Sequence, residues 1–341
     1  MATLHDVASR AGVSVATVSN VINNTRPVTP DTRNKVETAI KALNYVPNLA
    51  AKTLKTNNYN MIGIIAEDVS SFSTPPIIDA ICEYLGQKNF TVNLFNLRTY
   101  SIFDHEQHKQ QVANSLSILH ASCASGIIYI GADMDNVSYL RSLIDIPVVF
   151  AYCSADGDDY TITYNDYEAA ANIARHFILH GHKDFAIISG NNEQQFVQER
   201  ISGFTAVLNK AGITLPQQNI RSGGWHFETA RRQADWLLAA APNRPTAIFA
   251  MNDIMACAVI ASARNLSLNI PEDISVIGFD DRSCSAYSSP SITTMHIPLY
   301  DIGATAAEAI HTLIMGEDVP KKQCLLCELI ERESVATCCT Q

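Results

Sequence analysis

Apolar side chains in the first 45 residues recur three or four positions apart, which is the spacing of one face of a helix. They mark residues 4–11 and 15–22 as two short helices. Gly12 between them is free to take a positive φ. Thr29 followed by Pro30 is typical of a helix start, so a third helix is expected. A helix, a tight turn with glycine, a second helix and a third one to close the core predict a helix-turn-helix unit.

Residues 45–60 form a connector between this unit and the rest of the chain. Residues 48–55 have a helical pattern, but they make only about two turns, and isolated helices of that length are marginal in water. The polar run at 57–60 ends the pattern.

The pattern changes at residue 61, where β-rich apolar runs begin to alternate with amphipathic helices. The predicted strands are 61–66, 90–95, 126–131, 147–151, 185–190, 246–250 and 274–279. The predicted helices lie near 75–88, 105–120, 166–180, 198–211, 226–241 and 252–265. Apolar strands that alternate with helices indicate parallel sheets covered on both faces. Because the pattern is too long for one small sheet, we expect two doubly wound subdomains with a cleft between them.

Composition narrows the class of protein. An apolar fraction of 47 % and a charged fraction of 17 % over 341 residues exclude a disordered chain. No run approaches the ~20 apolar residues of a membrane helix. The N-terminus lacks the cationic start and apolar core of a secretory signal, so we expect a cytoplasmic protein. In that compartment the nine cysteines are expected to be reduced thiols.

The charge is divided unevenly along the chain. The formal net charge of −10 argues against nucleic-acid binding if it is taken whole. Residues 1–60, however, hold seven Lys and Arg against three Asp and Glu, a net charge of +4 that leaves −14 for the remainder. A small basic head on a large acidic body suits only the head to a polyanion.

Two strings in the head carry a specific resemblance. TLHDVASRAGVSVATVSNVINN (3–24) and TRNKVETAIKALNYVPNLAAKTLK (32–55) resemble the DNA-binding head of the LacI/GalR family of bacterial transcriptional regulators. Further matches follow in the family's order and spacing. They are GHKDFAIISG (181–190), ERISGF (199–204), FAMNDIMA (249–256), ISVIGFDD (274–281) and ELIERES (328–334). The resemblance therefore covers nearly the whole chain.

The resemblance implies a multidomain homodimer. Its parts would be a small all-α helix-turn-helix head (1–47), a hinge helix and linker (48–60), and an α/β core (61–341) that is similar to periplasmic sugar-binding proteins. In that core the chain would cross three times between two doubly wound parallel-sheet subdomains. The first would hold residues 61–161 and 291–323, and the second residues 163–290 and 324–341.

Within the head, the resemblance implies that the second helix reads DNA. Val15, Ala16 and Asn20 would face base edges in the major groove. Asparagine pairs bidentately with adenine, and valine or alanine contacts the methyl group of thymine. Hydroxyls suit phosphates. The DNA-contacting set implied is Thr3, Ser14, Val15, Ala16, Thr17, Ser19, Asn20, Arg26, Leu54 and Lys55. The alternative for Val15 and Ala16 is simple apolar cover.

The connector carries a second implied contact with DNA. At this hinge position the family places a leucine, here Leu54, in the minor groove at the centre of the operator. Apolar wedges of this kind part a base step and bend the duplex. Lys52 and Lys55 would lie beside phosphates. The alternative is that Leu54 packs the short helix onto the core.

In the core, the resemblance implies an effector site in the cleft. Arg200 would grip effector oxygens, Asn252 and Asp280 would hydrogen-bond the ligand, and Trp225 would pack on its flat face. Such donors, acceptors and an aromatic platform suit a sugar. The alternatives are a surface ion pair for Arg200, a turn acid for Asp280 and a core ring for Trp225. The full predicted set is Pro75, Phe196, Arg200, Trp225, Asn252 and Asp280.

Some positions depart from the family pattern. Pro75 and Pro76 stand where many members carry paired aromatic residues that sandwich a ring, which weakens the case for a purine effector. Asp166 follows Asn165 where the reverse order is commoner, so its role as a ligand or hinge residue stays open. Gln198, like Phe196, is a candidate for the cleft wall.

Metal sites and catalytic motifs are not indicated. Cys324 and Cys327, with Cys338 and Cys339, have the residue types of a zinc site. Residues 323–330, however, read as one strand, in which positions i and i+3 point to opposite faces. His176 and His180 lack the glutamate of an HExxH motif, and P-loop, GxGxxG and GxSxG motifs are missing. We expect no enzyme, cofactor or metal.

These observations together predict a cytoplasmic homodimeric repressor. It would bind a pseudo-palindromic DNA operator and respond to a small effector, a saccharide or sugar phosphate, that acts as inducer or corepressor. The chain ends without a leucine heptad, so a coiled-coil tetramer is not expected. The alternatives are a nucleoside- or purine-responsive regulator, a solute-binding module without a DNA role, and an enzyme on the same scaffold.

Overall fold

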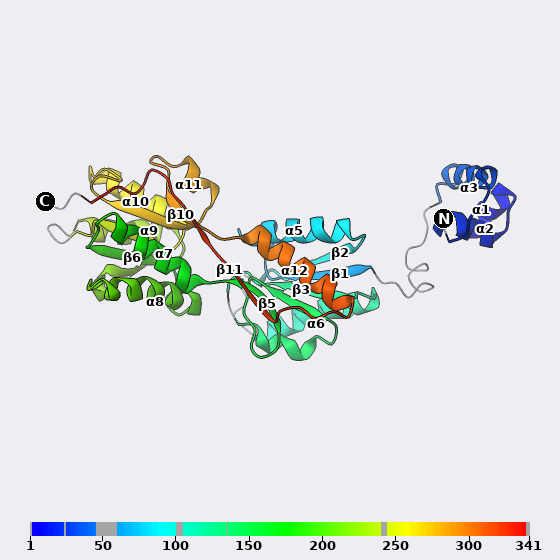
Figure 1. Cartoon of the computed structure of the whole chain (residues 1–341), viewed down its shortest axis with the longest axis horizontal. Helices are drawn as coiled ribbons and strands as arrows, with labels where there is room; N and C mark the ends of the chain where they lie inside the picture. The colour runs from blue at the N-terminus through cyan, green and yellow to red at the C-terminus, as the bar shows by residue number, and fades with distance from the viewer. Residues whose placement is uncertain are drawn as a thin grey trace. The chain divides into compact units, whose positions relative to one another are not determined.

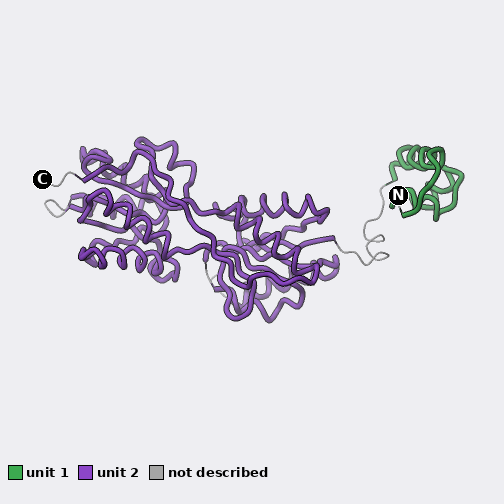
Figure 2. Tube along the Cα trace, in the orientation of Figure 1, with its two compact units in different colours: residues 1–59 green, residues 60–341 purple. Residues whose placement is uncertain are grey.

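The computed structural model describes residues 2–23, 25–45, 60–99, 105–134, 136–239 and 244–338. It divides into two compact units, residues 1–59 and residues 60–341 (Figure 2). The first unit is all-α and the second is α/β, as the sequence predicts.

The described residues of the first unit form three helices: α1 (Leu4–Ala11), α2 (Val15–Asn23) and α3 (Pro30–Ala42). Thr3 and Asp6 form a capping box at the start of α1, in which each side chain accepts a hydrogen bond from the other's backbone N–H. Gly12 ends α1 with φ 66°, the left-handed conformation that lets the chain turn into α2. The buried core is Val7, Ala8, Val18, Val21, Val36, Ala39 and Tyr45.

The first sheet of the core has six parallel strands in the order β11-β5-β4-β3-β1-β2. They are β1 (Met61–Ala66), β2 (Thr91–Asn96), β3 (Gly126–Ile130), β4 (Val148–Ala151), β5 (Tyr160–Tyr164) and β11 (Lys322–Leu325). Its helices are α5 (Thr74–Gln87), α6 (His105–Ala121), α12 (Leu299–Ile314) and a 3-10 helix (Ser138–Leu143).

Alternation along β1 separates the two faces of this sheet. Ile62 and Ile64 belong to the same buried cluster as the apolar side chains of α5 and α12. Ile65 belongs to the cluster under α6. Gly63 faces the same way as Ile65, and a Cβ at Gly63 would lie 2.4 Å from Cδ1 of Leu119 on α6. A glycine is therefore needed where α6 approaches the sheet most closely.

The second sheet has the order β12-β10-β9-β8-β6-β7, with β12 antiparallel to β10 and the other pairs parallel. Its strands are β6 (Phe185–Ser189), β7 (Ile220–Ser222), β8 (Ala247–Ala250), β9 (Ser275–Asp280), β10 (Thr293–His296) and β12 (Glu328–Ile330). Its helices are α7 (Asp166–Leu179), α8 (Gln195–Lys210), α9 (Phe227–Leu238), α10 (Asp253–Asn265), α11 (Ser283–Tyr287) and a 3-10 helix (Gln217–Asn219). Figure 1 shows α8 and α10 on opposite sides of the sheet.

The chain passes three times between the two sheets (Figure 1). The first passage joins β5 to α7, the second joins β10 to α12, and the third joins β11 to β12.

These passages correct the predicted subdomain boundaries. Residues 291–296 were expected in the first subdomain, but β10 pairs with β9 in the second sheet, so the second passage lies between His296 and Leu299. The polar Thr293 and Thr294 hide this strand from an apolar pattern. The first sheet also continues through Tyr164 and, in β11, through Leu325.

The single strand predicted at 323–330 is wrong for a related reason. It consists of β11 and β12, which belong to different sheets, with Leu326 and Cys327 between them. The apolar pattern runs through the third passage without a break, since the linking residues are themselves apolar.

Candidate functional site

The first candidate site is the exposed side of α2. Ser14 Oγ accepts a hydrogen bond from the backbone N of Thr17 at 3.1 Å, so Ser14 caps α2 as its position predicts. Ala16 is exposed, and Ser19 and Asn20 are half-buried. The Oδ1 atom of Asn20 accepts a hydrogen bond from Thr25 Oγ1 at 3.0 Å, which orients the amide group.

The remaining predicted DNA contacts differ in their placement. Val15 is half-buried and packs against the core of the head, so part of its surface serves as apolar cover. Thr3 and Arg26 are exposed. Leu54 and Lys55 lie outside the described residues, and their contacts stay predictions.

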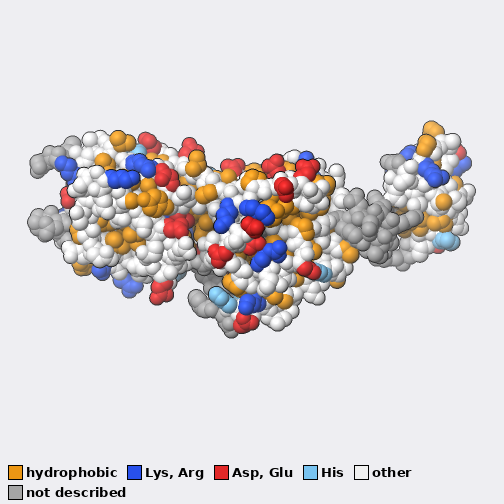
Figure 3. Space-filling view, turned by 60° about the horizontal axis from the view of Figure 1, so that its bottom comes forward, with side chains coloured by type: hydrophobic (Ala, Val, Ile, Leu, Met, Phe, Trp, Pro, Cys, Tyr) orange, Lys and Arg blue, Asp and Glu red, His pale blue; other side chains and the backbone are white. Residues whose placement is uncertain are grey.

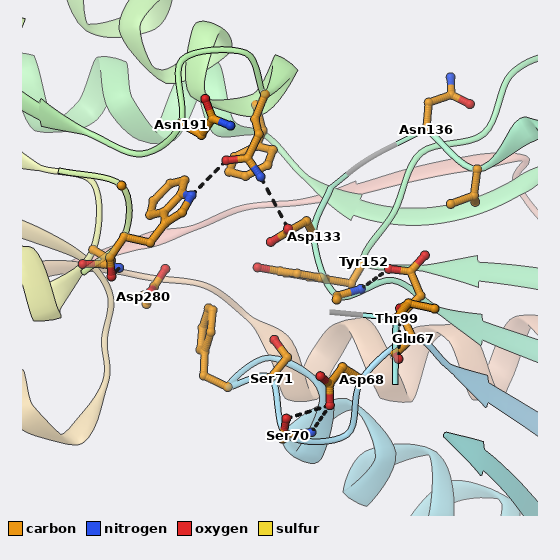
Figure 4. Close-up of a pocket in the computed structure, with 18 of the residues that line it drawn as sticks. Glu67, Asp68, Ser70, Ser71, Thr99, Asp133, Asn136, Tyr152, Asn191 and Asp280 are labelled. Atoms are coloured by element: carbon orange, nitrogen blue, oxygen red, sulfur yellow. Dashed lines mark hydrogen bonds between the residues drawn. The ribbon is translucent and has the colours of Figure 1, made fainter. Parts of the chain in front are cut away.

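The second candidate site is a cavity of about 1060 Å³ in the core, lined by residues of both subdomains (Figure 4). Its walls come from the carboxyl ends of strands. Glu67 follows β1, Tyr152 follows β4, Asn191 lies just beyond β6 and Asp280 ends β9. Parallel α/β sheets bind their ligands at this edge, because the loops that leave the strands are there.

Arg200 on α8 lines this cavity but is held by three internal hydrogen bonds. Its Nε donates to Asp166 Oδ1 at 2.6 Å, its Nη1 to the backbone O of Met251 at 2.8 Å, and its Nη2 to Tyr164 Oη at 3.0 Å. The guanidinium carbon also lies 3.7 Å from the ring centroid of Phe279. Arg200 and Asp166 are buried, and burial raises the pKa of Asp166. Asp166 is thus an ion-pair partner at the first passage, and Arg200 joins that passage to the second sheet.

Asp280 stands in a strained turn at the end of β9. Its φ is 97° and that of Asp281 is 55°, and left-handed residues other than glycine cluster at ligand sites. Arg282 holds the turn, because its Nε donates to Asp280 Oδ2 at 2.9 Å and its backbone N donates to Asp253 Oδ2 at 2.6 Å. Burial raises the pKa of Asp280 to about 6, against the opposing effect of Arg282 and Arg200. Burial and the charge of Asp280 raise the pKa of Asp253 to about 8.

Trp225 and Phe196 form a stacked pair on the second-subdomain side. Their ring centroids are 5.7 Å apart with an interplanar angle of 20°. A Cβ at Gly190 would lie 1.9 Å from the indole, so a glycine there makes room for the ring. The Nε1 atom of Trp225 donates to Gln194 Oε1 at 2.9 Å, and Gln194 Nε2 reaches Asp133 Oδ2 across the cavity at 3.5 Å (Figure 4).

Asn252 lines the cavity with a side chain that is also structural. Its Oδ1 accepts a hydrogen bond from the backbone N of Met255 at 2.8 Å and caps α10. Its Nδ2 lies 3.5 Å from the backbone O of Trp225.

Two predicted cleft residues lie elsewhere. Pro75 is exposed in the first turn of α5, and neither Pro75 nor Gln198 is among the described residues that line the cavity. Gln198 instead donates to the backbone O of Asn192 at 2.6 Å. Phe72, just before α5, is the aromatic residue of this segment that faces the cavity, and the Arg282 guanidinium lies 3.9 Å from its ring centroid. Pro75 and Pro76 therefore give no reason to exclude a ring-shaped effector.

Sequence reasoning missed much of the first-subdomain wall. The residues concerned are Glu67, Asp68, Thr99, His105, His108, Asp133, Asn136, Tyr139 and Tyr152. Several of them directly follow an apolar run that predicts a strand. Their position at the carboxyl end of a strand was the feature of the sequence that could have identified them as cavity residues.

The cysteine and histidine candidates make no metal site in the described part of the chain, where no three metal-ligating side chains are grouped suitably. The ring centroids of His176 and His180 are 4.4 Å apart, and His180 Nδ1 lies 2.8 Å from the backbone O of His176. These contacts belong to the end of α7.

Comparison with known proteins places this arrangement in a family. The family described as bacterial regulatory proteins, lacI family, matches residues 3–48, and a periplasmic binding protein-like domain matches residues 174–335. The HTH-type transcriptional repressor PurR of Vibrio vulnificus is 34% identical over 94% of this chain and 95% of its own length. PurR of Erwinia tasmaniensis is 35% identical over 98% of this chain and 97% of its own.

The chain belongs to the LacI family.

The solved structure of a LacI-family repressor agrees over the whole chain. The Lac repressor dimer bound to operator and the anti-inducer ONPF superposes with a TM-score of 0.86 at 27% identity. The match covers 98% of this chain and 99% of that one. The predicted architecture, a helix-turn-helix head on a two-subdomain core, is confirmed.

LacI-family membership also settles the class of function. The chain is a DNA-binding transcriptional repressor under the control of a small effector, and not an enzyme. Repressors of this family bind their operators and effectors as dimers. In the described segments, every helix is too short or too polar to cross a membrane.

Proposed function

We propose that the effector is an uncharged saccharide bound at the carboxyl ends of the core strands. The observation that carries the proposal is the pairing of carboxylates with aromatic rings in one cavity. Asp280, Asp133 and Glu67 offer acceptors for hydroxyl groups, and Trp225 and Phe196 offer a flat apolar platform.

Charge in the cavity favours a neutral sugar over a sugar phosphate. Among the described residues, the lining holds four carboxylates, those of Glu67, Asp68, Asp133 and Asp280, against the two guanidinium groups of Arg200 and Arg282. Both guanidinium groups already pair with carboxylates, at 2.6 Å for Arg200 and 2.9 Å for Arg282. A phosphate would meet an excess of like charge, whereas carboxylates accept hydroxyl hydrogen bonds.

The experiment begins with the operator. Selection of duplexes from a random pool by the full-length protein, at moderate salt, suppresses the ionic non-specific binding and should enrich a two-fold palindrome. Binding to that operator is then measured with neutral sugars, sugar phosphates and nucleosides. A change in operator affinity with a neutral sugar supports the proposal, and a response to phosphates alone contradicts it.

A purine or nucleoside is the second candidate effector. Phe72 brings an aromatic ring to the first-subdomain wall, in addition to Phe196 and Trp225 on the other side. Planar bases stack on such rings. The curated relatives carry the name PurR, which adds weight to this candidate. The same panel decides, since a response to bases and nucleosides without one to sugars would select it.

For the head, we propose that Asn20 and Ala16 on α2 read bases in the major groove and that Leu54 wedges into the minor groove. The exposure of Ala16 and the fixed amide of Asn20 support the first part. Figure 3 shows acidic and basic side chains interspersed over the visible face of the core, unlike the basic patch that a phosphate backbone requires. Leu54→Ala should weaken binding to the selected operator far more than binding to random DNA. Equal losses on both would contradict the wedge.

We further propose a cytoplasmic location, where an operator is accessible. Effector binding would alter the relation of the two subdomains and thereby the order of the hinge at residues 48–60. The sign of the response, induction or corepression, is read from the operator assay.

A further inference from the structure

One part of the cavity is walled by the first subdomain. Its residues are Thr99, His105, His108, Asn136, Val137 and Tyr139. Figure 4 shows Asn136 and Thr99 at the opposite end of the cavity from Asp280, with Asp133 and Tyr152 between them. The cavity is thus long enough to have two ends of different composition.

A chain of hydrogen bonds fixes the wall at this end, with the bond between His108 and Tyr129 buried and the others half-buried. His108 Nδ1 lies 2.6 Å from Tyr139 Oη, and His108 Nε2 lies 3.0 Å from Tyr129 Oη. Tyr129 donates its hydroxyl proton to Glu67 Oε1 at 2.6 Å, and the backbone N of Ala132 donates to Glu67 Oε2 at 2.8 Å.

Glu67, which can only accept, determines which atom donates in each hydrogen bond of this chain. Because Tyr129 gives its only proton to Glu67, its oxygen accepts from His108 Nε2–H. Nδ1 is then the acceptor, and Tyr139 donates to it. Burial lowers the pKa of His108, in agreement with the neutral imidazole that this arrangement needs. The side chains of Tyr139 and Glu67 are therefore held in place before any ligand arrives.

Two further contacts shape the same wall. The ring of His105 lies parallel to that of Tyr139, with centroids 4.4 Å apart and an interplanar angle of 4°. The Oδ1 atom of Asn136 accepts from the backbone N of Ser138 at 2.9 Å, and its Nδ2 donates to Asp156 Oδ1 at 2.9 Å. A flat ring pair beside fixed amide and carboxylate groups is the chemistry that takes the C–H face and the hydroxyls of a sugar unit.

We propose that this end is a second subsite and that the effector is a disaccharide or longer. One sugar unit would lie between Trp225 and Asp280, and the next against His105 and Tyr139. The cavity volume of about 1060 Å³ reaches the top of the range of roughly 300–1,000 Å³ for sites that hold drug-sized ligands, well beyond the needs of one hexose. This inference rests on the proposed saccharide effector.

The test is calorimetry on the full-length protein with defined sugars. Glucose, galactose and mannose are compared with cellobiose, lactose, maltose and mannobiose. We expect at least one disaccharide to bind ten-fold or more tightly than either of its constituent monosaccharides.

Variants show which residues provide the additional affinity for the disaccharide. His105→Ala removes one ring of the stacked pair, so it should reduce the advantage of the disaccharide to about two-fold and leave the affinity for the monosaccharide unchanged. His120→Ala is the matched control, because His120 lies on the same helix, is exposed like His105, and pairs with Asp145 away from the cavity. It should change neither affinity.

Each alternative result has a distinct meaning. A monosaccharide that binds as tightly as every disaccharide overturns the second subsite and leaves the saccharide effector intact. Equal losses for both ligands in His105→Ala overturn it as well. Binding of a base or nucleoside in place of all sugars overturns the proposed effector and the subsite together.

Discussion

At the residue scale, Arg200 shows how one side chain can both stabilise the first passage between the subdomains and line the effector cavity. Three of its five N–H donors are used by Asp166, Met251 and Tyr164, which belong to the first passage and the second sheet. These hydrogen bonds fix Arg200 in the cavity wall, so its structural role does not depend on contact with the effector.

Arg200→Ala should therefore destabilise the core as well as impair the effector response. It leaves the Asp166 carboxylate buried without its partner, a change that costs about 3–5 kcal/mol for ion pairs of this kind. Urea denaturation of the variant measures the loss. The exposed pair of Arg175 and Glu168 is the control, since Arg175→Ala should cost about 0–1 kcal/mol. Equal losses of unfolding free energy in the two variants would contradict a stabilising role of the Arg200–Asp166 ion pair.

Asp280 should make effector binding depend on pH. Its pKa is raised to about 6, so the carboxyl changes from mostly protonated to mostly ionised between about pH 5 and pH 7. The ionised form accepts two hydroxyl hydrogen bonds, and saccharide affinity should therefore rise over this range. Calorimetry at several pH values measures it. In Asp280→Asn the rise near pH 6 should disappear, and a persistent rise would assign the titration to another group.

The same shift has the opposite sign for stability. A carboxyl whose pKa is higher in the folded chain than in the unfolded chain binds its proton more tightly when folded. Its contribution to the free energy of unfolding is complete below about pH 4 and is lost as the pH rises through about 6.

Sequence reasoning identified the second-subdomain wall better than the first. Arg200, Phe196, Asn252 and Asp280 line the cavity and lie in or near strings that resemble the family. Trp225 also lines it, at a position that the resemblance implied without a matching string around it. The wall around His105 and Tyr139 has no such string, and the contacts that assemble it join residues far apart in the sequence. Only three-dimensional packing brings these together.

At the element scale, apolar periodicity located most of the core and failed at a few strands. The strands β1, β3, β4, β6, β8 and β9, whose residues are almost all buried, were predicted within about a residue or two. Strands β5, β7 and β10 were not, because threonine, tyrosine and arginine break their apolar runs. One of these, β7, lies at a sheet edge, where a strand needs less apolar surface. Strands β11 and β12 were predicted only as one merged strand.

Gly12 and Gly86 should respond in opposite directions to the same substitution. In the described residues, no heavy atom lies within 4 Å of a Cβ built at either position, so only the backbone decides. Gly12 has φ 66°, and Gly12→Ala should destabilise the head by about 1–2 kcal/mol.

Gly86 lies within α5, where Gly86→Ala should stabilise the core by about 0.5–1 kcal/mol. Thermal unfolding of the full-length variants, followed by circular dichroism, gives both values. Destabilisation of similar size at both sites would show that side-chain space, rather than backbone conformation, limits them.

At the scale of the whole molecule, operator and effector must influence each other equally. If a sugar changes operator affinity by some factor, the operator changes sugar affinity by the same factor, commonly 5–150-fold. Titration of the sugar into the protein, with and without saturating operator duplex, measures the second factor against the first. Unequal factors would show that the two ligands select more than two states of the dimer.

The three passages between the sheets also constrain how the chain is made. The first sheet begins with β1 at Met61 but is complete only when β11 arrives at Lys322–Leu325. The second sheet is complete only when β12 is added at Glu328–Ile330. A ribosome that adds about 5–20 residues per second therefore completes the head long before it can close either sheet. A chain cut between Gly316 and Lys322 would keep the three helices of the head and lack the closing strand of both sheets, so the core is whole only after residue 330 has been added.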